Sequence, residues 1–233
     1  MQTYPQTISD ESLDLQAFEK VTEVLCSRIC HDLISPMGAV KNALELMDGN
    51  HDLGSEVHTL LQQSTSQALD KLSIYRVAFG LNGASMMNST ERFAEIMLGF
   101  EKAFKFKGTI KQGLLDTLCP EHMRPMGQKL VVHLLLVLSE IVPFGCELET
   151  LAFEQGIEIN AKGRLFTLKG DYAQALKDGV KPDDATPQNI FIYYLMNSLE
   201  RLNIKMELEH DGVDRVKIQL KPLVSLAQSD LLF

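Results

Sequence analysis

The sequence predicts an α+β protein in which an N-terminal helical hairpin is followed by an α/β sandwich. In the first 80 positions, apolar residues recur at steps of three, four or seven, which is the period of an α-helix. Beyond position 90, helical segments alternate with short strand-like segments and turn dipeptides. We therefore expect two domains, at 9–82 and 90–233, joined by a small, polar, glycine-containing linker.

Two long helices account for the first domain. One is expected at 11–48, with Ser9 and Asp10 capping its start and Pro36 bending it. The other is expected at 55–79, and the short connection makes the two helices antiparallel neighbours. A hairpin with this much apolar surface cannot bury all of it alone. We therefore expect two copies of the chain to pair as a homodimer and complete a four-helix bundle.

The second domain mixes helices with strands. Gly156 and the dipeptide Asp211-Gly212 predict hairpin turns, which indicate a mostly antiparallel sheet. The helical pattern covers 91–104, 121–142 and 187–202, and the strand pattern covers 107–112, 147–153, 156–161, 204–209 and 213–220.

The composition excludes several classes of function. The 233 residues carry 22 Lys and Arg against 31 Asp and Glu, a net charge of −9, which argues against binding nucleic acid or an anionic membrane surface. No apolar run approaches the roughly 20 residues of a membrane-spanning helix, and the N-terminus lacks the features of a signal peptide. We expect a cytoplasmic protein with reduced thiols, in which Cys26 and Cys30 pack in a helix interface and bind no metal.

One of the six histidines differs from the others in its position. The centre of the apolar stripe on the first helix, at Phe18, Leu25 and Ile29, lies roughly opposite His31, so its imidazole is expected to be exposed. A neutral imidazole is a nucleophile that can accept a phosphoryl group, and the adjacent Asp32 can orient the ring or steady its positive form. The strip around the ring is small and polar: Ser27, Ser35, Gly38, Asn42 and Glu45.

These residues carry a resemblance to a known family. The run His31-Asp32-Leu33-Ile34-Ser35-Pro36-Met37 resembles the H-box of two-component histidine kinases, with a proline five residues after the histidine. The longer stretch 25–47, and residues 75–80 of the second helix, are similar to the ChpT family of alphaproteobacterial histidine phosphotransferases. This resemblance covers the first 80 residues and implies that His31 is the phosphoacceptor on a dimerising bundle.

The resemblance also implies a second domain like the ATP-binding domain of histidine kinases, but the sequence departs from that pattern. A kinase needs an asparagine on the helix at 128–140 to hold magnesium, and this helix has none; His133 lies near the expected position. The 15 glycines never occur as G-x-G, the spacing of phosphate-binding loops. We therefore expect a degenerate ATPase-like domain that binds no nucleotide and needs no cofactor of its own.

A phosphotransferase of this kind obtains its phosphoryl group from another protein. The resemblance implies a multistep phosphorelay connected with cell-cycle regulation, in which His31 accepts phosphate from a receiver-domain aspartate and passes it to another receiver. The implied donor is the receiver of a CckA-like hybrid kinase, and the implied acceptors are CtrA- and CpdR-like regulators. The receiver would supply Mg²⁺. Two alternatives stay open: a non-catalytic dimeric scaffold that binds receivers, and a divergent ATP-dependent kinase.

Further residues are expected to dock the receiver. Gly38 and Asn42 lie one and two turns beyond His31 on its face, and a glycine inside a helix costs about 1 kcal/mol, which calls for a reason. Arg28 either contacts phosphate or an acidic receiver, or pairs with Asp32 four residues later. Ser35 either activates water or bonds the local backbone. The remaining candidate is Arg76, in the family-like segment of the second helix.

Overall fold

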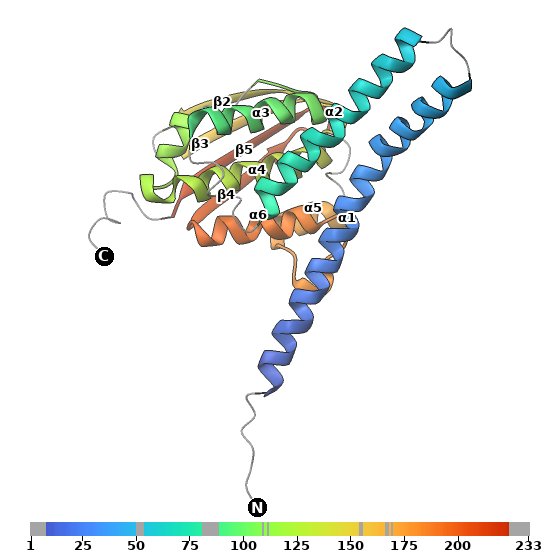
Figure 1. Cartoon of the computed structure of the whole chain (residues 1–233). Coiled ribbons are helices and arrows are strands. Elements are labelled where there is room, and N and C mark those ends of the chain that lie inside the picture. The colour runs from blue at the N-terminus through green and yellow to red at the C-terminus, as the bar shows by residue number, and fades with distance from the viewer. Residues whose placement is uncertain are drawn as a thin grey trace, which may run out of the picture.

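The computed structural model describes residues 8–49, 54–80, 89–108, 110, 112–153, 156–165, 168 and 170–223. Its first domain is a hairpin of two long antiparallel helices, α1 (Ile8–Gly49) and α2 (Gly54–Phe79). The second domain packs against the middle of this hairpin, and the N-terminal end of α1 projects beyond it (Figure 1). The expected hairpin is therefore confirmed, whereas the expected linker lies mostly outside the described residues.

Two details of the first helix differ from expectation. Because α1 begins at Ile8, Ser9 and Asp10 lie within its first turn and do not precede it. The helix is continuous through Pro36, and the bend expected there stays a prediction. Phe18, expected at the centre of the buried stripe, is 69% exposed, because the apolar stripe of α1 extends beyond the part of the helix that its own chain covers.

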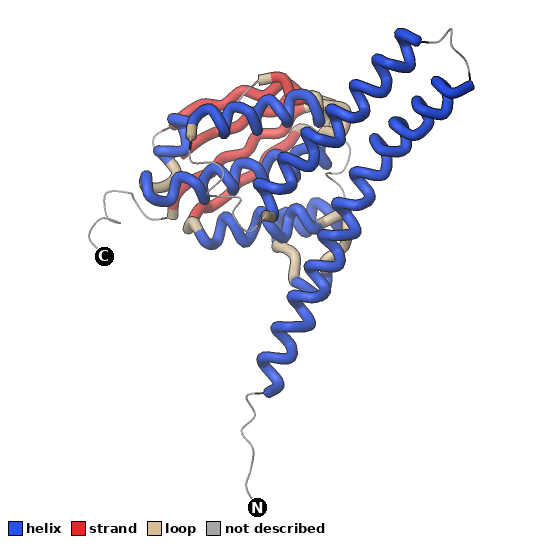
Figure 2. Tube along the Cα trace, in the orientation of Figure 1, coloured by secondary structure: helices blue, strands red, loops and turns tan. Residues whose placement is uncertain are grey.

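The second domain is a layer of helices on a five-stranded sheet. Figure 2 shows the strands in one layer and the main helices, α3, α4 and α6, on one face of it. Its helices are α3 (Thr90–Phe104), α4 (Arg124–Ile141), α5 (Asp171–Asp178) and α6 (Ile190–Arg201), with short 3₁₀ helices at Gln112–Thr117, Glu121–Met123 and Pro182–Asp184 (η5). Its strands are β1 (Phe106–Lys107), β2 (Cys146–Phe153), β3 (Gly156–Lys162), β4 (Ile204–His210) and β5 (Arg215–Pro222).

The sheet has the order β1-β2-β3-β5-β4, in which only the β1–β2 pair is parallel among the described strands. Side chains alternate between its faces, as expected for a sheet covered on one side. On β5, for example, Val216, Ile218 and Leu220 are buried under the helices, while Lys217 and Gln219 face outward and bond Glu158 of β3. Both predicted hairpins are present, and the Asp211 carboxylate accepts bonds from backbone amides that close its turn.

Two expectations for the second domain are wrong. The strand expected at 107–112 is only two residues long, because the chain turns into a 3₁₀ helix from Gln112. The short helix α5 was not expected; Gly170 and Gly179, both with positive φ, bound it at either end. Four of the five expected strands and all three expected helices are otherwise confirmed to within a few residues.

A buried histidine joins the two domains. The ring of His133 on α4 stacks on Phe79 at the end of α2, with 5.6 Å between ring centroids. Its Nε2 donates to the carbonyl oxygen of Ala78 at 2.8 Å, and the hydroxyl of Ser198 donates to its Nδ1 at 2.7 Å. Burial lowers the pKa of His133 to about 4, so the ring is neutral at physiological pH and satisfied on both nitrogens.

None of the described helices is both long enough and apolar enough to cross a membrane. This agrees with the sequence, in which no apolar run reaches the length of a span.

Candidate functional site

His31 lies on the exposed side of α1, beside the second domain. Its side chain is 82% exposed, whereas the side chain of the next residue, Asp32, is only 10% exposed. The two face each other all the same, with Nδ1 of His31 3.4 Å from Oδ1 of Asp32. This confirms the expectation that the carboxylate flanks the ring. Because a carboxylate accepts hydrogen bonds, the contact favours a proton on Nδ1 and a free lone pair on Nε2.

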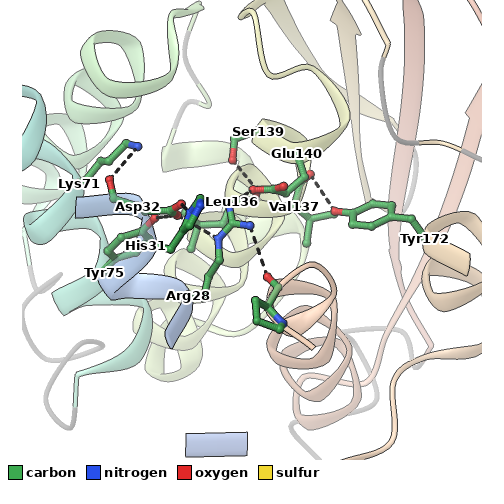
Figure 3. Close-up of polar contacts among 11 residues, drawn as sticks. Arg28, His31, Asp32, Lys71, Tyr75, Leu136, Val137, Ser139, Glu140 and Tyr172 are labelled. Carbon is green, nitrogen blue, oxygen red and sulfur yellow. Dashed lines mark hydrogen bonds and ion pairs between the residues drawn. The ribbon is translucent and has the colours of Figure 1, made fainter. Parts of the chain in front are cut away.

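Asp32 is held from several directions (Figure 3). Its Oδ2 accepts a hydrogen bond from the hydroxyl of Tyr75 on α2 and another, 3.0 Å long, from Nε of Arg28 one turn earlier on α1. Lys71 on α2 donates to the backbone carbonyl of Asp32 at 3.4 Å. The carboxylate beside His31 is therefore fixed in place, because its partners come from both helices of the hairpin.

Arg28 extends this network into the second domain (Figure 3). Its Nη2 pairs with Glu140 on α4, its Nη1 donates to the carbonyl oxygen of Pro187 at 3.4 Å, and its guanidinium lies 5.0 Å from the ring centroid of Phe191 on α6. The Arg28 side chain is only 15% exposed. Of the two roles considered for Arg28, the pairing with Asp32 is the one present; its planar fork joins the two domains.

The electrostatics of this network follow from its burial. Burial, together with the Asp32 carboxylate, raises the pKa of Tyr75 well above its usual range, so the hydroxyl keeps its proton and remains a donor. Burial alone would lower the pKa of Arg28, but the carboxylates of Glu140 and Asp32 raise it. Burial raises the pKa of Glu140, and the attraction of Arg28 offsets part of that rise.

The other docking candidates are divided between the two helices of the hairpin. Ser35, Asn42 and Arg76 are exposed, and Gly38 is half-buried with open space where a Cβ would stand. A residue with a side chain would therefore fit at Gly38 within this chain, which leaves close approach by a partner as a reason for glycine. Lys41 and Glu45 pair at 3.6 Å, so the carboxylate on this strip is balanced by a neighbouring cation.

Sequence reasoning missed the residues that support Asp32. Lys71 and Tyr75 lie four residues apart on α2. Glu140 lies near the end of the apolar helix α4 and is the one acidic residue of that helix. A buried carboxylate is rarely found without a partner, so Glu140 was the available signal. Its partner lies 112 residues earlier in the chain, and nothing in the local pattern connects the two.

α4 is the helix on which a kinase would be expected to carry its magnesium-binding asparagine, and here it carries His133. His133 is 2% exposed and bonded on both sides, as described above. One turn further, Tyr172 of α5 packs on the same helix and donates to the carbonyl oxygen of Val137 at 3.4 Å. On the described part of α4, His133 and the backbone at Val137 therefore contact other parts of the protein.

No cluster of three or more His, Cys, Asp or Glu side chains suited to a metal ion occurs among the residues that the structure describes. Cys26 and Cys30 are both exposed in the single chain, and their expected packing in a helix interface stays a prediction. Cys119 and Cys146 are buried free thiols.

The site is thus an exposed histidine beside a buried carboxylate, on a helical hairpin backed by an α/β domain. Residues 95–214 match the family model of the histidine phosphotransferase C-terminal domain. The chain is 27% identical over 223 residues to "Protein phosphotransferase ChpT" of Brucella abortus (strain 2308), covering 91% of this chain and 97% of that protein.

A solved structure, "1.7 Angstrom Structure of a Bacterial Phosphotransferase", shares the fold with a TM-score of 0.65 and 21% identity, covering 86% of this chain and 95% of that one. Because the family model spans half of the chain, the protein belongs to the histidine phosphotransferase family. The resemblance to ChpT-type proteins is thereby confirmed. The second domain, which has no sharp motif of its own, is the part that the family model recognises.

Proposed function

We propose that this protein is the phosphohistidine intermediate of a multistep phosphorelay. The observation that carries the proposal is the pair His31 and Asp32: an imidazole that is 82% exposed, with one nitrogen against a buried carboxylate. A group held in this way needs no further pocket of its own. It can be presented to a partner that brings the phosphoryl group and the rest of the active site.

The transfer step can be written through this geometry. With its proton on Nδ1 facing Asp32, His31 attacks phosphorus through the lone pair of Nε2. The bond from phosphorus to the aspartyl oxygen of the donor receiver breaks, and that aspartate leaves as a free carboxylate. The imidazole becomes positively charged, and Asp32 stabilises it. In the second half-reaction, the aspartate of another receiver attacks the same phosphorus and Nε2 leaves with its lone pair. We propose that the receivers supply the Mg²⁺ for both halves.

We propose that ATP takes no direct part. The sequence supports this through the missing asparagine and the missing G-x-G spacing. The packing of His133 and Tyr172 on α4 supports it as well, because these side chains are committed to protein partners. The second domain would then serve to support the hairpin.

We propose that two hairpins pair into a four-helix bundle. Large apolar side chains remain exposed along both helices, more than a single hairpin can cover. Pairing through a two-fold axis would bury the same face of each copy. The exposed apolar residues of the hairpin are Leu15, Phe18, Ile34, Met37, Leu44, Leu46, Met47, Leu60, Leu69 and Leu72.

The partners are proposed by class and by resemblance. The donor is the receiver domain of a hybrid kinase of CckA type, and the acceptors are response regulators of CtrA and CpdR type. We propose that they dock on the hairpin near His31 through Ser35, Gly38, Asn42 and Arg76, of which Ser35, Asn42 and Arg76 are exposed. Glu45, on the same helix as His31, is paired with Lys41, which limits repulsion from the acidic pocket of a receiver.

The test is a phosphotransfer profile against a panel of receivers. Receivers carrying labelled phosphate should label the wild-type protein and leave His31→Ala unlabelled. His58→Ala, which removes an exposed histidine of α2, is the matched control and should be labelled like the wild type. Labelled ATP with magnesium should leave the protein alone unlabelled. Receiver binding that survives His31→Ala, with no transfer from any donor to the wild type, would favour the scaffold.

A further inference from the structure

We propose that Glu140 of the second domain is a positioning residue for phosphotransfer and acts on His31 through Arg28 and Asp32. The proposal rests on the proposed function, since it concerns how the phosphoacceptor is prepared. It gives the second domain a role at the site: this domain sets the position and tautomer of the imidazole without touching the reacting atoms.

The second domain holds Arg28 through three contacts. Glu140, the carbonyl oxygen of Pro187 and the ring of Phe191 all contact its guanidinium, and all three belong to the second domain. Figure 3 shows the guanidinium between Glu140 on one side and Asp32 on the other. An arginine on an exposed helix face would sample many rotamers, whereas this one has a single orientation for its fork.

Arg28 in turn holds Asp32. With Nη2 on Glu140, the Nε of Arg28 is left to donate to Oδ2 of Asp32 at 3.0 Å. Tyr75 donates to the same oxygen, so Oδ1 is the atom that turns toward Nδ1 of His31. Fixing one oxygen of a carboxylate fixes the direction of the other. Glu140 therefore determines, through Arg28 and Asp32, where the acceptor for the Nδ1 proton of His31 lies.

Stability alone does not account for these charged side chains. A buried ion pair costs about as much in desolvation as it returns, and apolar residues of similar size often stabilise as well or better. The two domains already share an apolar contact through Phe79 and Phe191, whose ring centroids lie 5.8 Å apart. The series of charged side chains from Glu140 to Asp32 is thus explained by its effect on the position and tautomer of the His31 imidazole.

The test is Glu140→Gln in the full chain, with Glu200→Gln as the matched control. Glu200 is exposed on α6 and lies nine residues beyond Phe191, about 13 Å further along the helix. Loss of the Glu140 charge should lower the maximal rate of transfer from a phosphorylated receiver about tenfold, as loss of an outer partner of a histidine does elsewhere. The receiver concentration at half-maximal rate should stay unchanged, and the control should behave as wild type.

A second readout separates positioning from folding. In ¹⁵N spectra of the neutral imidazole, wild-type His31 should show the proton on Nδ1. Glu140→Gln, and Arg28→Lys as a second variant that keeps the charge but loses the fork, should shift signal toward the Nε2-protonated form. An unchanged tautomer in a folded variant overturns the proposal. If the wild type accepts no phosphate from any receiver, the proposed function fails, and the tautomer measurement still decides the role of Glu140.

Discussion

The hydroxyl of Tyr75 on α2 donates a hydrogen bond to the carboxylate of Asp32 on α1, 43 residues earlier in the chain. This bond joins the two helices of the hairpin directly beside the exposed His31. The helical period explains why both residues face inward, but only the packing of the hairpin places them at the same height.

Tyr75→Phe should keep the packing of the ring and lose the hydrogen bond. Because the bond is buried and its acceptor is a carboxylate, we expect unfolding to become easier by about 2 kcal/mol. Urea unfolding followed by circular dichroism measures this loss. Tyr193→Phe is the control, since its hydroxyl makes no hydrogen bond to the described residues, and it should change stability by less than about 0.5 kcal/mol. Equal losses in both variants would show that the Tyr75 bond contributes little.

Asp32→Asn should slow phosphotransfer more than it weakens receiver binding. The amide keeps the size of the carboxylate but not its charge, so the imidazolium formed in transfer loses its partner. We expect the rate at saturating receiver to fall about a hundredfold, measured by rapid quench with labelled phosphoreceiver.

The matched control for this variant is Asp48→Asn. Asp48 is exposed on the same helix, 17 residues and about 25 Å from His31. Its substitution should leave the rate unchanged. A wild-type rate for Asp32→Asn in a folded protein would remove Asp32 from the mechanism and leave His31 as the one catalytic group.

The stability of the protein should depend on pH through His133. Burial lowers its folded pKa to about 4, whereas the unfolded chain takes up the proton at an ordinary pKa of about 6.5. Between these values the unfolded state binds more protons, so the contribution of His133 is complete above about pH 6.5 and is lost as pH falls toward 4. The loss is on the order of 3 kcal/mol.

Urea unfolding at several pH values between about 4.5 and 7 tests this linkage. His133→Gln should be less stable than wild type at neutral pH but should lose less stability on acidification. His122→Gln removes an exposed histidine from the same domain and should reproduce the wild-type pH dependence. Parallel curves for wild type and His133→Gln would contradict the assignment of a buried neutral ring.

Leu69→Glu should disrupt the proposed dimer. Leu69 is 58% exposed on α2, where a second hairpin would cover it. Light scattering after gel filtration should give twice the 26.1 kDa chain mass for wild type and the chain mass itself for the variant. Leu98→Glu on α3, 48% exposed in the second domain, is the control and should remain dimeric. A wild-type protein that runs as a single chain would contradict the bundle.

The sequence was sufficient to predict those features that depend on a pattern within one helix or turn. The period of the apolar residues predicted both helices of the hairpin, and the position of His31 opposite the stripe predicted its exposure. The turn at Asp211-Gly212 fixed the β4–β5 hairpin, because the Asp211 side chain satisfies the amides that follow it.

The sequence was insufficient where the signal is between elements. Glu140, Arg28 and Tyr75 meet only because the second domain packs beside the hairpin, and no period within one element encodes that contact. The buried stripe of α1 was overestimated for the same reason. Apolar residues such as Phe18 have the helical period of a core position, but the chain's own partners do not extend far enough to cover them.

The central claim is that Nε2 of His31 carries the phosphoryl group while Nδ1 stays turned to Asp32. Phosphorus–nitrogen correlation spectra of the ¹⁵N-labelled protein, phosphorylated by a receiver, measure this directly. The account predicts one phosphohistidine, at His31, with phosphorus coupled to Nε2. Phosphorus coupled to Nδ1, or phosphate on any other residue, would contradict it.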